Sequence, residues 1–311
     1  MNLSALSHKL LVIALLALIT LAFIPIAGLP YHRAVSETMD AGHFPAFMII
    51  TLCAYILLKR AAVPRPLLIA TLSSICLALA IELIQPFFSR TQSSRDFFVG
   101  NLGILAAAIG IHFRRYPQWW LKPMLVTATL VIFAGIATPA YREWLAVAWQ
   151  HRQFPVLGDF ENTQDLRLWD PTDPDSHSPT RISRSVDHAS HGKHSLMIEA
   201  GLSSWPGIVN NTGDMNWAAF KNLRFDIYNP TEPFILHLRV DDNQDIDDYD
   251  ERFNNQVTVE TGRNEIAIPL SAVEVQRPMR RLHLNAVRRI VLYLDAQPAP
   301  RTFYIDHIRL E

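Results

Sequence analysis

The sequence predicts a multi-domain chain, with an α-helical transmembrane bundle of five spans in residues 1–150 and an all-β jelly-roll sandwich in residues 151–311. Three observations lead to this fold class. Long uncharged apolar segments, separated by short basic loops, fill the first half of the chain. Charged residues become frequent after about residue 150. Apolar and polar residues then alternate at the period of a β-strand.

Five segments are apolar enough to cross a bilayer, which requires about 20 residues of α-helix. They are residues 10–30, 43–58, 66–88, 97–113 and 123–140. A cleaved signal peptide is the alternative for the first segment, but its apolar stretch is longer than usual and lacks a clear cleavage site. The fourth segment is rich in Gly and Ala, which favours close helix packing in lipid.

Basic residues in the short loops predict the orientation of the bundle, because cytoplasmic loops carry an excess of Lys and Arg. Lys9 and the loops 59–65 and 114–122 hold most of the basic residues near the spans. The N-terminus is therefore expected in the cytoplasm. Five spans then place the C-terminal domain in the periplasm or outside the cell, in a multi-pass protein of the bacterial inner membrane surrounded by lipid. The formal net charge of −1 gives no indication of a nucleic-acid partner.

Seven polar residues are expected at the outer ends of the second, third and fourth spans. They are Asp40, His43, Glu82, Gln85, Arg90, Asp96 and Asn101. Polar groups near the hydrocarbon are costly unless they are paired or hydrated, so each is a functional candidate. One interpretation pairs Arg90 with Glu82 or Asp96 and assigns the other residues to helix ends. In the other, the seven form a catalytic site whose histidine is a general base and whose arginine holds an anion.

Two segments that contain these residues, MDAGHFPAFMII and ALAIELIQPFFSRTQSSRDFFVGNLGILAAAIGI, resemble the VanZ-like family of small membrane proteins. The resemblance covers about residues 30–115 and includes Gly103 in the Gly-rich fourth segment. The founding member of that family is associated with resistance to the glycopeptide antibiotic teicoplanin. The resemblance therefore implies a link to antibiotic resistance or envelope polysaccharide, but it names no reaction.

The C-terminal half contains about ten short segments with period-two alternation, such as LRFDIY, FILHLRV, NEIAIPL and RRIVLYL. One buried and one hydrated face per strand favour closure into a β-sandwich. The segments VLGDFENTQDLRLW, HGKHSLMIE, WAAFKNLRFDIYNP and TFYIDHIRLE resemble the galactose-binding-like jelly rolls found as carbohydrate-binding modules. The resemblance implies an envelope glycan or polysaccharide as partner. The candidate ligand-binding residues are Trp205, Trp217, Tyr249 and Arg252, although a buried core tryptophan is the usual alternative.

The same resemblance implies a structural calcium shared by the opening and closing strands, with Glu161 and Asp306 as ligands and backbone carbonyls completing the shell. The alternative places Asp159 and Glu161 in exposed turns. The acidic run 241–255 lacks the spacing of an EF-hand loop, so a solvated loop is favoured there. We expect no other cofactor.

The sequence contains no nucleophile motif, phosphate loop or zinc signature. The first hypothesis is therefore a non-enzymatic envelope protein whose outer domain binds glycan. The second is a membrane enzyme that acts at the outer membrane face on a lipid-linked or envelope substrate. Its candidate catalytic residues are Asp40, His43, Glu82, Arg90 and Asp96. A transporter is less well supported, because no internal repeat is evident.

Overall fold

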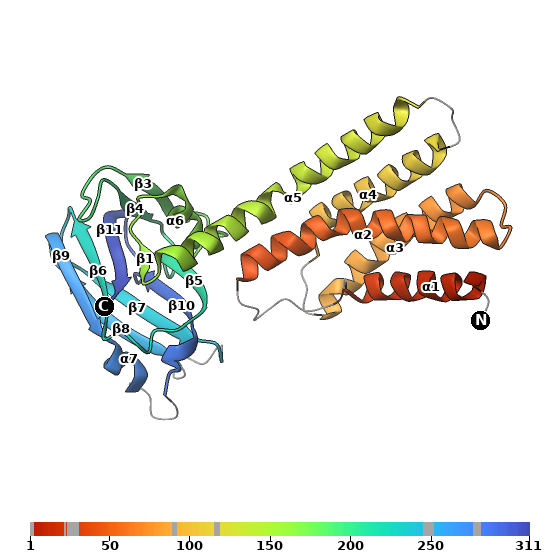
Figure 1. Cartoon of the computed structure of the whole chain (residues 1–311). Coiled ribbons are helices and arrows are strands. Elements are labelled where there is room, and N and C mark those ends of the chain that lie inside the picture. Colours follow the sequence, from red (N-terminus) through yellow and green to blue (C-terminus); the bar gives the residue numbers. More distant parts are fainter. Residues whose placement is uncertain are drawn as a thin grey trace. The chain divides into compact units, whose positions relative to one another are not determined.

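The computed structural model describes residues 3–21, 23, 31–88, 92–114, 119–244, 252–275 and 281–311. The chain divides into two compact units, Met1–Arg142 and Glu143–Glu311. The first is helical and the second consists mainly of β-strands (Figure 1).

Five long helices account for the first unit and the start of the second: α1 (Leu3–Leu21), α2 (His32–Arg60), α3 (Pro66–Ile84), α4 (Ser94–Phe113) and α5 (Leu121–Gln153). The short 3-10 helix η1 (Gln85–Phe88) follows α3. Four of the described helical segments are long and apolar enough to cross a membrane: Arg33–Arg60, Pro66–Phe88, Ser94–Phe113 and Leu121–Gln153. The fifth predicted span is not confirmed. The apolar stretch found in α1 is only Lys9–Thr20, and residues 22 and 24–30 lie outside the described part of the chain.

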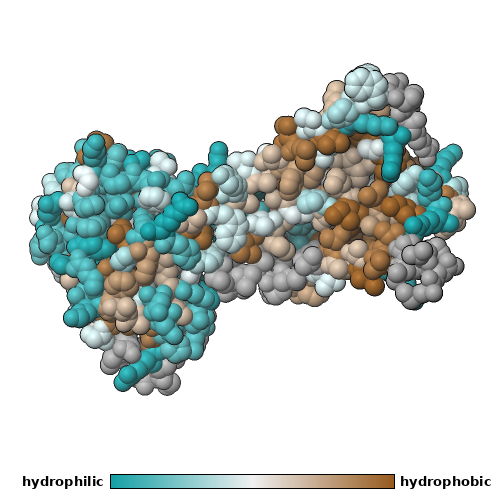
Figure 2. Space-filling view, viewed as in Figure 1, coloured by the Kyte–Doolittle hydropathy of each residue, from teal (hydrophilic) through white to brown (hydrophobic). Residues whose placement is uncertain are grey.

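The helical unit leaves many large apolar side chains uncovered. Leu68, Leu72, Leu79 and Leu83 of α3 are all exposed. Apolar residues are prominent over the helical unit, whereas hydrophilic residues dominate the view of the β unit (Figure 2). Contiguous apolar surface of this kind is unusual on a protein that faces water, and it is the surface that lipid would cover.

Helices α2 and α4 pack closely because α4 presents glycines to α2. A Cβ atom added at Gly103 would collide with the carbonyl oxygen of Phe44. A Cβ atom at Gly100 would lie 2.8 Å from Cδ2 of Phe47. Small residues let two helix backbones approach in this way. The Gly-rich fourth segment therefore has the packing role expected of it.

The second unit contains two antiparallel sheets. The six-stranded sheet has the order β3-β4-β11-β6-β9, with β1 paired to β11, and the five-stranded sheet has the order β2-β5-β10-β7-β8. The strands are β1 (Val156–Gly158), β2 (Trp169–Pro171), β3 (Arg181–Ser185), β4 (Ser195–Ala200), β5 (Gly207–Met215), β6 (Asn222–Asn229), β7 (Phe234–Asp242), β8 (Phe253–Val259), β9 (Gly262–Pro269), β10 (Val287–Tyr293) and β11 (Arg301–Leu310). Short helices α6 (Thr163–Leu168), α7 (Leu270–Val275) and η3 (Leu284–Ala286) lie between strands.

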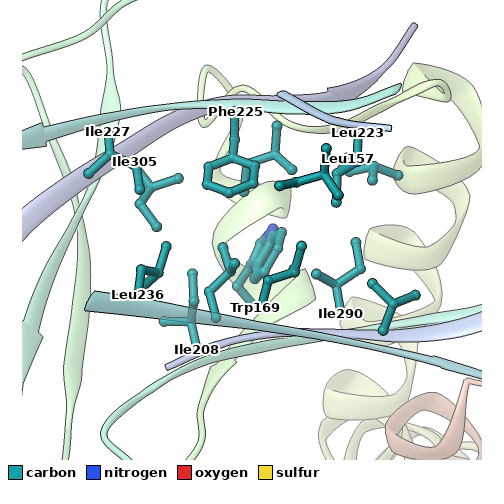
Figure 3. Packing of buried hydrophobic residues seen from close by; sticks show 14 of the residues in the cluster. Leu157, Trp169, Ile208, Leu223, Phe225, Ile227, Leu236, Ile290 and Ile305 are labelled. Atoms are coloured by element: carbon teal, nitrogen blue, oxygen red, sulfur yellow. The ribbon is translucent and has the colours of Figure 1, made fainter. Parts of the chain in front are cut away.

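The hydrophobic core lies between the two sheets. In β6, Leu223, Phe225 and Ile227 are buried and alternate with less buried residues, as the period-two pattern predicts. Phe225 faces Ile208 of the five-stranded sheet, and the indole of Trp169 lies between the sheets (Figure 3). The predicted antiparallel β-sandwich is therefore confirmed.

Candidate functional site

The outer face of the five-stranded sheet carries a row of side chains that point away from the core. In β10, Ile290 and Leu292 are buried in the core, so Arg289, Val291 and Tyr293 must project from the opposite face. Because the neighbouring strands β5 and β7 are in register with β10, their side chains extend the same surface. These neighbours are Asn211 and Val209, which pair with Arg289 and Val291, and Arg239, which pairs with Val291.

These side chains form the floor of a cavity of about 560 Å³. Its lining residues are Thr172, Trp205, Val209, Asn211, Arg239, Arg252, Arg289, Val291 and Tyr293. Pockets of about 300–1,000 Å³ are typical of small-molecule sites. We refer to this cavity as the sheet groove.

Two aromatic rings, those of Trp205 and Tyr293, line the sheet groove. The Trp205 side chain is 58% exposed, and its ring centroid lies 5.7 Å from that of Tyr293 in an edge-to-face arrangement. The hydroxyl of Thr172 donates a hydrogen bond of 2.6 Å to the carbonyl oxygen of Trp205, which holds the loop in place. The ring of Tyr293 also stacks with that of His237, at a centroid distance of 4.9 Å.

Charged groups at the floor are held by one carboxylate. Nε of Arg239 donates to Oδ1 of Asp241 at 2.8 Å, and Nη1 of Arg289 lies 3.5 Å from Oδ2 of the same residue. Asp241 is buried and forms ion pairs with both guanidinium groups. The sheet groove thus offers flat aromatic surface together with several N–H donors, which suits a ligand that has both apolar faces and hydroxyl groups.

The four predicted ligand-binding residues have different positions in the structure. Trp205 and Arg252 line the sheet groove. Trp217 requires a correction, because its side chain is fully buried in the core and cannot contact a ligand. Tyr249 lies outside the described residues. The sequence interpretation missed Tyr293, whose outward position follows from the alternation of β10 but whose partners depend on strand order.

The two predicted calcium ligands contact one loop. Oε1 of Glu161 accepts hydrogen bonds from the backbone N–H groups of Lys193 at 2.6 Å and His194 at 2.7 Å. Oδ2 of Asp306 accepts from the N–H groups of Ser190 at 2.7 Å and His191 at 2.9 Å. N–H donors thus occupy oxygen atoms that a calcium ion would need, so the residues as placed do not fit the ion. The calcium site expected from the resemblance therefore finds no support in the positions of Glu161 and Asp306.

The pKa values of these two carboxyl groups move in opposite directions. Desolvation opposes the charge of Glu161, but the N–H groups of Lys193 and His194 outweigh it and lower its pKa. Burial raises the pKa of Asp306 despite its N–H donors. Both groups act as hydrogen-bond acceptors for residues 190–194.

In the helical unit, three of the seven predicted polar residues converge. His43 of α2, Glu82 of α3 and Asp96 of α4 each place a ligand-type atom within 4.8 Å of the other two. All three residues are buried, with 7%, 3% and 3% exposure respectively. We refer to these three residues as the bundle cluster.

Helix packing explains why these three residues meet. Asp96 lies one helical turn before Gly100, and His43 lies one turn before Phe47, so both extend the close contact between α2 and α4. Glu82 lies one turn beyond Ala78 on the buried face of α3. The buried faces of α2, α3 and α4 therefore meet at His43, Glu82 and Asp96.

The other four predicted residues have different positions. Oδ2 of Asp40 lies 3.5 Å from Nη1 of Arg95, which also contacts Glu37. Gln85 is buried in η1. Asn101 donates from Nδ2 to the carbonyl oxygen of Phe97 in its own helix, at 2.8 Å. Arg90 lies outside the described residues.

Ser93 is a functional candidate that the sequence interpretation missed. Its hydroxyl accepts a hydrogen bond from the N–H group of Asp96 at 3.2 Å and caps α4. Its own N–H group donates to Oε2 of Glu82 at 2.9 Å. A Ser-x-x-Asp pattern before an apolar helix is a capping signal that could have identified it.

Comparisons with known proteins concern the β unit. No protein-family model matches this chain, and no curated protein matches it. Among solved structures, the chain is similar to a family 11 carbohydrate-binding module from Clostridium thermocellum in complex with a beta-1,3-1,4-mixed-linked tetrasaccharide, at 17% identity and a TM-score of 0.40, covering 50% of this chain and 93% of that chain. It is also similar to an exo-beta-agarase, at 17% identity and a TM-score of 0.40, covering 50% of this chain and 25% of that chain.

A third similar structure is a carbohydrate-binding module specific for non-crystalline cellulose, at 15% identity and a TM-score of 0.37, covering 50% of this chain and 92% of that chain.

The chain combines a helical unit, with four candidate membrane spans, and an antiparallel β-sandwich. The VanZ-like interpretation of residues 30–115 stays a prediction.

Proposed function

We propose that this chain is a membrane-anchored protein that binds an envelope glycan in the sheet groove. The observation that carries the proposal is the exposed ring of Trp205 beside Tyr293, above a floor that presents Asn211 and Arg239. The C–H faces of a sugar ring pack on aromatic rings, while its hydroxyl groups accept hydrogen bonds from amide and guanidinium groups.

The sheet groove is organised before any ligand arrives. Thr172 holds the Trp205 loop, the edge-to-face contact with Tyr293 restrains the indole, and Asp241 fixes Arg239. Groups held in their binding geometry lose little conformational entropy on association. This arrangement favours specific binding of a short saccharide.

The helical unit anchors the glycan-binding domain to a membrane. Four apolar helices are long enough to anchor the chain in a bilayer. The excess of basic residues in the loops 59–65 and 114–122 supports a cytoplasmic location for those loops. With five spans, the β-sandwich lies outside the cytoplasm, where envelope polysaccharides are found. On the basis of the VanZ-like resemblance, the proposal includes a contribution to glycopeptide resistance.

The test uses the full chain in detergent micelles and a panel of envelope glycans, with affinities measured by calorimetry. Trp205→Ala should weaken binding roughly thirtyfold, because removing an aromatic anchor from a binding site costs about 2 kcal/mol. Trp119→Ala, at another exposed tryptophan, should bind as the natural protein does. The proposal fails if no glycan binds or if Trp205→Ala leaves the affinity unchanged.

A second candidate function is an enzyme that acts on a lipid-linked or envelope substrate at the outer membrane face. The convergence of His43, Glu82 and Asp96 favours it, because an imidazole beside carboxylates is suited to general base catalysis. His43→Gln should then abolish the phenotype that the natural protein supports, at unchanged protein abundance. A normal phenotype at normal abundance would contradict the acid–base mechanism.

A further inference from the structure

The bundle cluster brings an imidazole and two carboxylates together in a region shielded from water. Glu82 and Asp96 are both buried, and their oxygen atoms lie within 4.8 Å of each other and of a His43 nitrogen. Two carboxylates this close repel each other when both are ionised, and burial strengthens the repulsion. The arrangement requires a positive charge or a shared proton between them.

Hydrogen bonds orient two of these side chains, those of His43 and Glu82. Nδ1 of His43 lies 3.0 Å from the carbonyl oxygen of Met39. A carbonyl can only accept, so Nδ1 is the donor in this contact and Nε2 is the ring nitrogen left to face a ligand. The N–H group of Ser93 fixes Oε2 of Glu82. A metal-binding histidine commonly makes a hydrogen bond like that between His43 and Met39 through its other ring nitrogen, and this bond sets its tautomer and ring orientation.

Asp96 supplies an independent indication of a ligand. Its Oδ1 atom is buried and has no hydrogen-bond partner among the residues that the structure describes. A buried carboxylate oxygen without a donor is costly, and native structures rarely leave one in this state. The nearby Arg95 contacts Glu37 at 3.0 Å and Asp40 at 3.5 Å, so its guanidinium is engaged beside the bundle cluster.

We propose that His43, Glu82 and Asp96 bind one divalent transition-metal ion, with zinc or manganese as the best fits. One nitrogen and two carboxylate oxygens are ligands that these ions accept, whereas calcium takes six to eight oxygens. Two atoms bound at about 2.0–2.2 Å lie at most about 4.4 Å apart. The bundle cluster needs only a small adjustment to reach this geometry.

Three protein ligands leave a coordination position open, as in metal sites that bind a water molecule or a substrate. This inference does not depend on glycan binding by the β-sandwich. The positive charge that the two carboxylates require has two candidate sources, of which the metal ion is one. The competing source is the guanidinium of Arg90, a residue that lies outside the described part of the chain.

The experiment uses the full chain in detergent. The protein is stripped with a chelator, incubated with excess Zn²⁺ or Mn²⁺ and desalted, and the retained metal is measured by mass spectrometry. We expect about one ion per chain, and a loss of most of it in His43→Gln and Asp96→Asn. His112→Gln alters another histidine, near the end of α4, and should retain the ion.

Two further measurements separate loss of the site from loss of folding. Glu82→Gln preserves an oxygen that can accept from Ser93 and removes only the charge, and it should also reduce metal retention. Binding of Co²⁺ should produce visible absorption that changes in His43→Gln, because a nitrogen ligand is lost. The proposal is overturned if the natural protein retains no metal, which favours Arg90 as the counter-charge, or if folded His43→Gln retains as much metal as the natural protein.

Discussion

The carbonyl oxygen of Phe44 lies where a side chain on Gly103 would have to begin. This contact sets how closely helices α2 and α4 approach each other. His43 directly precedes Phe44, and Asp96 lies two turns before Gly103 on the same face of α4. The contact between one glycine and one carbonyl therefore helps to place two members of the bundle cluster.

A first prediction follows from this contact. Gly103→Ala should separate α2 from α4 and destabilise the helical unit by about 1–3 kcal/mol, which is typical of overpacking. Gly110→Ala is the matched control, because a Cβ atom there meets no atom within 4 Å. Thermal unfolding in detergent should show a lower melting temperature for Gly103→Ala only. Equal melting of the two variants would contradict the proposed packing.

A second prediction concerns the floor of the sheet groove. Tyr293→Leu keeps apolar bulk but removes the ring that contacts Trp205 and His237. Glycan affinity should fall roughly tenfold, equivalent to about 1.4 kcal/mol. Tyr304→Leu makes the same change in β11 of the other sheet and should leave affinity unaltered. Similar losses in both variants would place the glycan elsewhere or indicate a general effect on folding.

A third prediction concerns the pH dependence of stability. Asp165 is fully buried and accepts hydrogen bonds from Trp149 and Gln153. Burial raises its pKa to about 6, and the nearby Asp159 also favours the protonated form. The folded state therefore binds a proton more readily than the unfolded state. This contribution to stability is fully present below the unfolded pKa of 3.8 and is lost as the pH rises through about 6.

Asp165→Asn removes this titration and keeps an oxygen that accepts both hydrogen bonds. The variant should melt several degrees higher than the natural protein at pH 7, and the difference should shrink as the pH falls toward 4. Melting curves across this range measure the effect. A difference that does not change with pH would show that Asp165 does not titrate as described.

A fourth prediction concerns calcium. Since N–H groups occupy Oε1 of Glu161 and Oδ2 of Asp306, a calcium chelator should leave the melting temperature unchanged. Glu161→Gln should lower it, because hydrogen bonds to a charged acceptor are stronger than those to a neutral one. A clear rise in melting temperature with added calcium would instead support the predicted calcium site, through preferential binding to the folded state.

A fifth prediction concerns topology. An alkaline phosphatase reporter, which is active only outside the cytoplasm, should be active when fused after Glu311 and silent when fused near Arg60. The reason is the excess of basic residues in the loop 59–65. The reverse pattern would place both the β-sandwich and the bundle cluster on the cytoplasmic side.

Local patterns in the sequence are enough to locate the apolar helices and the β-strands. Apolar length marked the four helical segments that are able to cross a membrane, and period-two alternation marked buried strand positions such as Leu223 and Phe225. Both signals are local, because each depends on residues within a single helix or strand.

Which candidate residues share a site depends on how the helices and strands pack against one another. Asp96 and Asn101 are five residues apart, yet Asp96 joins His43 and Glu82 while Asn101 bonds within its own helix. The rotation of each helix depends on contacts with its neighbours, and a sequence pattern does not contain them.

Trp205 and Trp217 show the same limit in the β-sandwich. Both lie in segments that flank β5, yet one lines the sheet groove and the other is buried in the core. The order β2-β5-β10-β7-β8 brings β10 beside β5, although about 70 residues of chain separate these strands. Pairing between distant strands placed Tyr293 beside Trp205, and it could be known only once the sheets had formed.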